Sequence, residues 1–169
     1  KHADTIKKLV AACKCESVLD YGCGKGYLAK SLPFPIWEYD PAIPEKDASP
    51  RPADLVVCLD VLEHIEPEKL HLVLDDLRRV VKKVGYFTIH IGPAQKHYAD
   101  GRNTHLIQQP PAWWEKKLTK FFEVGKMSEL RVGDAMGKPT GNKELHVIVG
   151  PKHAKAPPAL VPPTPSIAA

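Results

Sequence analysis

Near the start of the chain stands the stretch Ser17-Val18-Leu19-Asp20-Tyr21-Gly22-Cys23-Gly24-Lys25-Gly26-Tyr27-Leu28-Ala29. A short apolar run ends in a carboxylate, three glycines follow at alternate positions, and a helix-like segment comes next. Glycine tolerates positive φ and leaves its backbone open to a ligand, and the first N–H groups of a helix lack partners within it. The stretch therefore predicts a buried strand, a tight turn and a helix, which is where open α/β sheets bind ligands.

The glycine spacing discriminates between cofactors. A dinucleotide-binding turn needs Gly-x-Gly-x-x-Gly or Ala, and Tyr27 occupies its third small position here. From Asp20 to Gly26 the chain has Asp-x-Gly-x-Gly-x-Gly, which resembles motif I of the class I S-adenosylmethionine-dependent methyltransferases. An ordinary strand-to-helix turn is the alternative, so the remaining segments have to decide.

Length and composition limit the function classes. The 169 residues predict one domain, and an apolar fraction of 43% is compatible with a packed core. The formal net charge of +4 fits an anionic ligand but is too small to indicate nucleic acid as a partner. No apolar run reaches the length of a membrane span, so no membrane contact is expected. We expect a single domain over residues 1–150 and a Pro-rich flexible tail over residues 151–169.

The four cysteines, Cys13, Cys15, Cys23 and Cys58, do not have the spacing of a zinc site. Cys23 lies in the glycine turn, and Cys58 lies inside an apolar run. We expect reduced thiols, no bound metal and a cytoplasmic location, because disulfides persist mainly in oxidising compartments.

Helix and strand patterns alternate along the chain. Helical spacing covers residues 4–13, the segment from Pro67 to Val81 with Gly85 just beyond its end, and the segment that starts at Pro110. Strand patterns after the first one cover residues 35–40, 53–60, 86–91, 122–132 and 144–149. This alternation predicts a Rossmann-like, three-layer α/β sandwich with a mostly parallel sheet. A Gly-rich turn over residues 133–141 joins the last two strands, so one antiparallel strand is expected.

The second strand ends at Asp40, 20 residues after Asp20. In nucleotide-binding α/β folds an acid at this position accepts hydrogen bonds from ribose hydroxyls, and a strand-ending acid before Pro41 is the alternative. Residues 41–53 carry four prolines with charges between them, which is the composition of a loop. They leave too little regular chain for another helix and strand. We therefore expect a sheet that is reduced at the edge after the second strand.

Two later segments strengthen the family resemblance. The run Asp54-Leu-Val-Val-Cys-Leu-Asp-Val-Leu-Glu-His64 looks like the motif IV region of small-molecule class I methyltransferases. The family's loop histidine, helix and bent strand resemble Thr104-His105, Pro111-Ala112-Trp113-Trp114 and Phe121-Phe122-Glu123-Val124. The resemblance covers residues 4–150. It implies an enzyme that transfers a methyl group from S-adenosylmethionine to a small-molecule acceptor by in-line displacement.

The resemblance also implies the residues of the cofactor site. Asp20 matches the carboxylate near the cofactor's amino group, Gly22 and Gly24 match the glycines along its methionine part, and Asp40 matches the ribose acid. The implied set is Asp20, Gly22, Cys23, Gly24, Gly26, Asp40, Pro41, Leu59, Asp60 and Val61. The family's next helix, third strand and adenine-contacting acid have no counterpart here. Asp47 is a candidate for the adenine contact, and a solvated loop acid is the alternative.

Two histidines are candidate catalytic bases, because histidine is the natural proton acceptor near neutral pH. His64 follows the motif IV strand and His105 lies in the loop after the next strand, and the carboxyl ends of parallel strands meet at one mouth. A loop-capping role is the alternative for each. The candidate acceptor-contacting residues are Glu63, His97, Arg102, Asn103 and Trp113. Their alternatives are a turn-holding carboxylate at Glu63, a solvated loop charge at Arg102, and a core position for one of the two adjacent tryptophans.

Two other functions stay open. Methylation of a macromolecule is one, although base-amino methyltransferases carry Asn/Asp-Pro-Pro-Tyr/Phe at motif IV, where this chain has Leu59-Asp60-Val61-Leu62. A non-catalytic cofactor-binding or partner-binding domain is the other. Binding of S-adenosylmethionine separates the enzyme functions from a partner-binding domain. The sequence leaves the acceptor and the oligomeric state undetermined.

Overall fold

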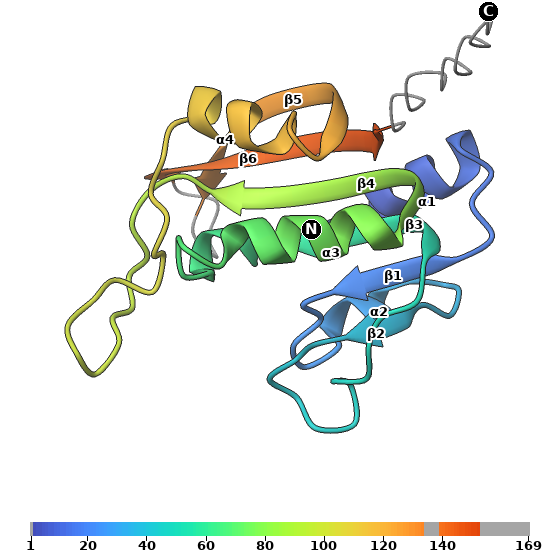
Figure 1. The fold of residues 1–169 in the computed structure, drawn as a ribbon, viewed down its shortest axis with the longest axis horizontal. Helices are drawn as coiled ribbons and strands as arrows, with labels where there is room; N and C mark the ends of the chain where they lie inside the picture. The colour runs from blue at the N-terminus through green and yellow to red at the C-terminus, as the bar shows by residue number, and fades with distance from the viewer. Residues whose placement is uncertain (1, 134–138, 153–169) are drawn as a thin grey trace, which may run out of the picture.

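The structure, a computed structural model, describes residues 2–133 and 139–152. Its strands form one six-stranded sheet in the order β2-β1-β3-β4-β6-β5 (Figure 1). The strands are β1 Val18–Tyr21, β2 Trp37–Tyr39, β3 Ala53–Leu59, β4 Val81–His90, β5 Phe122–Gly133 and β6 Pro139–Pro151. Strands β2, β1, β3 and β4 are parallel, and β6 runs antiparallel to both of its neighbours. The predicted mostly parallel sheet with one antiparallel strand is confirmed.

Helices cover both faces of the sheet, so the three predicted layers are present. They are α1 Ala3–Ala12, α2 Tyr27–Ser31, the 3-10 turn η1 Leu62–His64, α3 Leu70–Val80 and α4 Pro111–Leu118. Apolar side chains of α3 and α4 pack on one face, and those of α1 and α2 pack on the other. In Figure 1, α3 crosses the front of the sheet and α1 lies behind it. Strand β3 is apolar on both faces because both are covered.

The sheet ends at β2, as the prolines predicted. Residues 41–52 contain no helix or strand, and the segment instead folds back on the strand that precedes it. The N–H of Asp40 donates to the carbonyl of Lys46 at 3.0 Å. The guanidinium of Arg51 lies 3.8 Å from the ring centroid of Trp37, which makes a cation–π contact at the edge of the sheet.

The predicted boundary between α3 and the next strand is wrong. The helix ends at Val80, and β4 begins at once with Val81, so Gly85 lies inside the strand and does not follow a helix end. A Cβ at Gly85 would come within 2.7 Å of Val149 Cγ2, which explains a glycine there by close packing. The helix also starts at Leu70, three residues after Pro67.

The last strand is longer than predicted, since β6 spans Pro139–Pro151. Most of the predicted turn over residues 133–141 and residues 153–169 of the predicted tail lie outside the described residues. All four cysteines are free thiols. Within the described residues, no helix has the length and apolar character needed to cross a membrane.

Candidate functional site

In the glycine turn after β1, Gly22 is packed against a neighbouring side chain, whereas Gly24 faces open space. Gly22, Gly24 and Gly26 all have positive φ, at 79°, 50° and 71°. A Cβ at Gly22 would lie 2.5 Å from Val61 Cγ2, whereas a Cβ at Gly24 would meet nothing within 4 Å. The N–H of Gly22 and that of Cys23 both donate to the carbonyl of Tyr39. The turn is therefore fixed to β2 while its middle glycine faces open space.

Asp40 closes the second side of this turn. One carboxylate oxygen accepts the N–H of Gly24 at 2.8 Å, and the other accepts the N–H of Ala42 at 2.9 Å. Each carboxylate oxygen has a second lone pair, so the group can still accept bonds from a ligand hydroxyl. Pro41, which follows, is exposed, and so is Asp47 farther along the segment. The predicted ribose acid and the predicted methionine glycine are thus joined by a direct hydrogen bond.

Asp20 is a buried carboxyl group at the carboxyl end of β1. It is 3% exposed. Burial raises its pKa to about 7, and the nearby charge of Glu38 adds to the rise. The nearest cation is engaged elsewhere, because Lys46 Nζ lies 3.2 Å from Glu38 Oε1 and 3.3 Å from the carbonyl of Gly24. A cationic ligand group beside Asp20 would restore the charged carboxylate.

The end of β3 brings the predicted motif IV residues against β4. Asp60 has a φ of 54°, a conformation that Asp tolerates better than most residues and that is frequent at functional sites. Its N–H donates to the carbonyl of Thr88 at 3.1 Å, and the Thr88 hydroxyl donates to Asp60 Oδ1 at 2.8 Å. Leu59 and Val61 flank it, and Val61 packs on Gly22 of the glycine turn. The two predicted halves of the cofactor site are therefore in contact.

The two candidate bases lie side by side, as predicted. The ring centroids of His64 and His105 are 4.9 Å apart, and His105 also stacks on His90 at 5.3 Å. His64 Nδ1 lies 2.7 Å from the carbonyl of Thr104, and His105 Nδ1 lies 2.7 Å from that of Gly92. A carbonyl only accepts, so both Nδ1 atoms carry the proton and both Nε2 atoms carry a lone pair. Burial lowers the pKa of His64, which favours its neutral form.

Glu63 connects the turn after β3 to β4 and to the following loop. The N–H of His90 donates to Glu63 Oε1 at 3.0 Å, and the N–H of Ile107 donates to the Glu63 carbonyl at 3.0 Å. The side chain is fully buried. Burial raises the pKa of the Glu63 carboxyl to about 8. The alternative role, a carboxylate that holds the local turn, has direct support.

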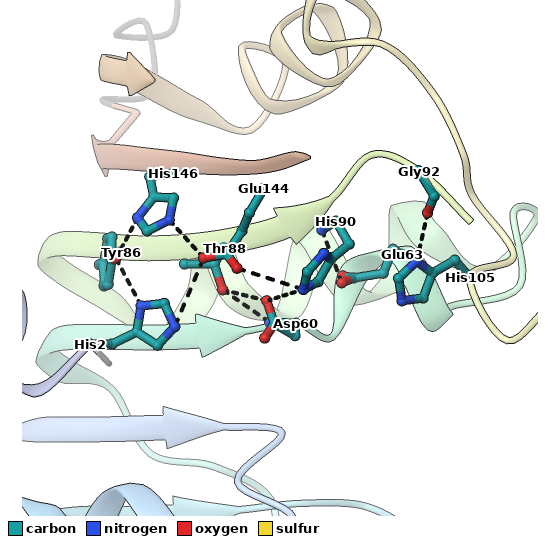
Figure 2. A network of polar contacts seen from close by, with 10 residues as sticks. All are labelled: His2, Asp60, Glu63, Tyr86, Thr88, His90, Gly92, His105, Glu144 and His146. Atoms are coloured by element: carbon teal, nitrogen blue, oxygen red, sulfur yellow. Dashed lines mark hydrogen bonds and ion pairs between the residues drawn. The ribbon is translucent and has the colours of Figure 1, made fainter. Parts of the chain in front are cut away.

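A strip of polar side chains on the α1 face of the sheet was not among the sequence candidates. It runs along β4 and β6 toward the mouth, as Figure 2 shows, and consists of His2, Tyr86, Thr88, His90, Glu144 and His146. Thr88 pairs with His146 and His90 with Glu144 across the two strands. Polar residues at alternate positions of β4 were the available signal, because side chains two apart in a strand share a face.

The loop between β4 and α4 is held by its own polar groups. Arg102 bonds to Asp100 and to both carboxylate oxygens of Glu66. The side chain of Asn103 makes four hydrogen bonds inside the loop, of which the longest, at 3.4 Å, reaches His97 Nε2. These contacts account for Arg102 and Asn103 as loop-forming residues, and their predicted contacts with an acceptor stay predictions.

The adjacent tryptophans divide as expected. Trp114 is fully buried in the core, while Trp113 is half-buried and meets it edge to face at 5.1 Å. Lys117 Nζ lies 4.9 Å from the Trp113 ring centroid. Trp113 therefore presents one ring face toward a cation, and its predicted stacking on an acceptor stays a prediction.

Comparison with known proteins bears on this site. Residues 2–124 match the family model described as "Methyltransferase domain". No curated protein matches the chain by sequence. Among solved structures, the N-methyltransferase NodS from Bradyrhizobium japonicum WM9, in complex with S-adenosyl-L-homocysteine, is similar with a TM-score of 0.60. It is 12% identical, and the alignment covers 90% of this chain and 86% of that one.

Two further structures have the same fold. Magnesium protoporphyrin IX methyltransferase from Synechocystis PCC 6803, with bound S-adenosylhomocysteine, has a TM-score of 0.56 at 15% identity, covering 89% of this chain and 84% of that one. The 1,6-didemethyltoxoflavin-N1-methyltransferase from Burkholderia thailandensis has a TM-score of 0.58 at 17% identity. The alignment covers 90% of this chain and 78% of that one. At these identities the likeness concerns the fold.

Proposed function

Because this chain belongs to the methyltransferase domain family, we propose that it transfers the methyl group of S-adenosylmethionine to a small-molecule acceptor. The use of S-adenosylmethionine and methyltransferase activity follow from the family. The small-molecule acceptor and the residues that serve it are our proposal. The observation that carries it is the contact between the glycine turn and the turn after β3: Val61 packs on Gly22, while Gly24 beside it faces open space.

The residues after β1 and β2 fit the cofactor. Gly24 faces open space on the glycine turn, so a ligand can approach its backbone closely. Asp20 would hold the cofactor's amino group, since its buried carboxyl has no cation committed to it. Asp40 would accept the ribose hydroxyls with the lone pairs that the N–H groups of Gly24 and Ala42 leave free. The segment 41–52, which has no helix or strand and is mostly exposed, would leave the adenine side open.

The proposed chemistry requires little beyond alignment and a suitably prepared acceptor. When bound, S-adenosylmethionine supplies a methyl group on a sulfonium, which an acceptor lone pair displaces in line. Holding two reactants in line supplies most of the rate in such a transfer. His64 and His105, whose rings lie 4.9 Å apart, are the groups proposed to receive or balance the acceptor's proton.

The burial of the candidate acid and base groups supports a small acceptor over a macromolecular one. Glu63 and Glu144 are fully buried and His105 is 8% exposed, so an acceptor atom must enter among side chains to reach them. Two of the similar structures act, by their names, on small molecules, a porphyrin and a toxoflavin precursor. The loop between β4 and α4, which leaves the sheet at the carboxyl end of β4 (Figure 1), would select the acceptor.

The test is a labelling experiment with methyl-labelled S-adenosylmethionine and a cell extract separated into small molecules, protein and nucleic acid. We expect label in the small-molecule fraction with the native chain and none with Gly24→Val as the background control. Label only in protein or nucleic acid would contradict the small-molecule acceptor. Binding of S-adenosylmethionine without label in any fraction would favour a non-catalytic cofactor-binding domain. A cytoplasmic location stays a prediction.

A further inference from the structure

Three side chains at the mouth have the composition of a metal site. Glu63 and His64 come from η1, and His105 comes from the loop after β4. One potential ligand atom of each lies within 4.8 Å of those of the other two. Two imidazoles and one carboxylate on one side of a cation, with the other positions open, form a recurrent arrangement for first-row divalent metals.

Both imidazoles are already oriented as metal ligands are. A metal-binding histidine usually donates its second ring N–H to a carbonyl or carboxylate, which fixes the tautomer and the ring plane. The carbonyls of Thr104 and Gly92 accept the Nδ1–H of His64 and His105, each at 2.7 Å. Each Nε2 therefore carries a lone pair, and neither ring can supply a proton to the other through Nδ1.

The carboxylate supplies an independent observation. Glu63 Oε2 is buried and has no hydrogen-bond partner among the described residues, while Oε1 accepts the N–H of His90. A buried acceptor without a partner is rare in folded proteins and requires an explanation. The ionised carboxylate and the imidazole lone pairs all accept, so a proton or a cation must lie between them to satisfy them. A cation between them would satisfy all three atoms at once.

We propose that Glu63, His64 and His105 bind one first-row divalent cation at the mouth of the site. The site holds cations such as Zn²⁺, Mn²⁺ or Co²⁺, for which imidazole and carboxylate are suitable ligands. The expectation of no bound metal rested on the spacing of the cysteines, and none of these three ligands is a cysteine.

Two neighbouring groups could compete for the cation. His2, Glu144 and His146 also gather within 4.8 Å, and so do Asp60, His90 and Glu144. Their carboxylates already have partners, since Glu144 Oε1 lies 2.6 Å from His146 Nε2 and Asp60 Oδ1 accepts the Thr88 hydroxyl. The Glu63 group is favoured because Glu63 Oε2 has no hydrogen-bond partner among the described residues.

The role of the cation in catalysis rests on the proposed function, whereas the site itself does not. Three protein ligands leave positions open for an oxygen of the acceptor. For a hydroxyl acceptor, a bound cation would lower the pKa of the hydroxyl, so that its proton would pass to water. The oxygen lone pair would then form a bond to the methyl carbon as the carbon–sulfur bond breaks and S-adenosylhomocysteine leaves. The Nε2 lone pairs of His64 and His105 would then be occupied, and neither would act as a free base.

The test is calorimetric titration of the chelator-treated full chain with Zn²⁺, Mn²⁺ and Co²⁺ separately, without S-adenosylmethionine. We expect one equivalent of at least one cation to bind, and binding to weaken about 10–100-fold in Glu63→Gln and in His105→Asn. His71→Ala, which removes an exposed histidine of α3, should bind like the native chain. Thermal unfolding with and without the cation checks that each variant folds, and only the native chain and His71→Ala should gain stability from it.

Three results would overturn the site. They are no binding of any of the three cations, unchanged affinity in folded Glu63→Gln and His105→Asn, or loss of binding only in Glu144→Gln, which would move the cation to the neighbouring groups. A parallel titration with S-adenosylmethionine separates this inference from the proposed function. Cofactor binding without cation binding removes the metal site alone, and the reverse removes the proposed function alone.

Discussion

Three equally buried carboxyl groups behave differently at the two ends of the sheet. Asp54, near the start of β3, is 4% exposed, while Asp20 and Glu63 at the opposite end are 3% and 0% exposed. The backbone N–H of Glu16 and the ammonium groups of Lys83 and Lys82 lower the pKa of Asp54 to about 2. Burial raises the pKa of Asp20 to about 7 and that of Glu63 to about 8.

The three carboxyls also differ in their partners. Asp54 has two lysines within 3.3 Å and a backbone donor at 2.9 Å, so its charge is neutralised within the chain. No salt bridge joins Asp20 or Glu63 to a cation within the part of the chain that the structure describes, and burial disfavours their charged form. Buried carboxyls with raised pKa values are frequent at functional sites, which makes this end of the sheet the candidate binding end.

The largest effect should come from filling the open end at Gly24. In Gly24→Val the side chain would occupy the space that a ligand needs beside the turn, so we expect calorimetric titration to detect no S-adenosylmethionine binding. Gly101→Val is the control, because Gly101 also has positive φ and open space at its Cβ. Native affinity in Gly24→Val would show that the turn does not hold the cofactor.

Removing the acid after β2 should have the next largest effect. Asp40→Ala should weaken cofactor binding by about 1–3 kcal/mol, because the ribose hydroxyls would lose a charged acceptor. Asp40→Asn should weaken it less, since the amide keeps one acceptor oxygen. Asp75→Ala, which removes an exposed carboxylate on α3 that pairs with Arg78, controls for the loss of charge. Equal affinity in Asp40→Ala and Asp75→Ala would contradict the ribose contact.

Cofactor binding should tighten with rising pH. With the pKa of Asp20 raised to about 7, the carboxyl is mostly protonated at pH 6 and mostly ionised at pH 8. If the ionised form binds the cofactor's amino group, affinity should rise about tenfold over this range. Asp20→Asn should bind weakly with little change across the same range. A native pH profile as flat as that of Asp20→Asn would remove Asp20 from the site.

The smallest effect concerns the paired end, where the pKa shift has the opposite sign. A carboxyl whose folded-state pKa is lowered stabilises the fold above its unfolded-state pKa, near 3.8, and that contribution is lost as pH falls toward about 2. Asp54→Asn should therefore be less stable than the native chain at pH 6 and should approach it at pH 2 in urea unfolding. A constant difference across this range would show that the ion pairs with Lys82 and Lys83 contribute nothing.

The residues predicted for the cofactor depend more on local sequence than those around β4 and β6 do. The glycine turn and the shortened segment after Asp40 depend on local chemistry, namely positive φ and the prolines that prevent regular structure. Contacts such as that between Gly24 and Asp40 join neighbouring strands, and strand order follows from the alternating pattern. The predicted set of cofactor residues accordingly meets at one edge, although no bound cofactor tests it.

The acceptor half depends on pairing across distant strands. His90 and Glu144 face each other only because β6 inserts antiparallel between β4 and β5, and no local pattern fixes that register. The wrong prediction that Gly85 follows a helix end has a similar origin. A glycine just past a helical pattern is the usual sign of a helix end, but here the tertiary packing of Val149 requires it.

The central claim, that ligands complete the carboxyl end of the sheet, can be tested by measuring carboxyl pKa values by NMR. The chain labelled with carbon-13 at its Asp side chains would be titrated with acid, with and without S-adenosylhomocysteine, and Asp20→Asn and Asp54→Asn would assign the signals. We predict a pKa near 7 for Asp20 that falls when the ligand binds, and a pKa near 2 for Asp54 that does not change. An Asp20 pKa near 3.8, or one that the ligand leaves unchanged, would contradict the account.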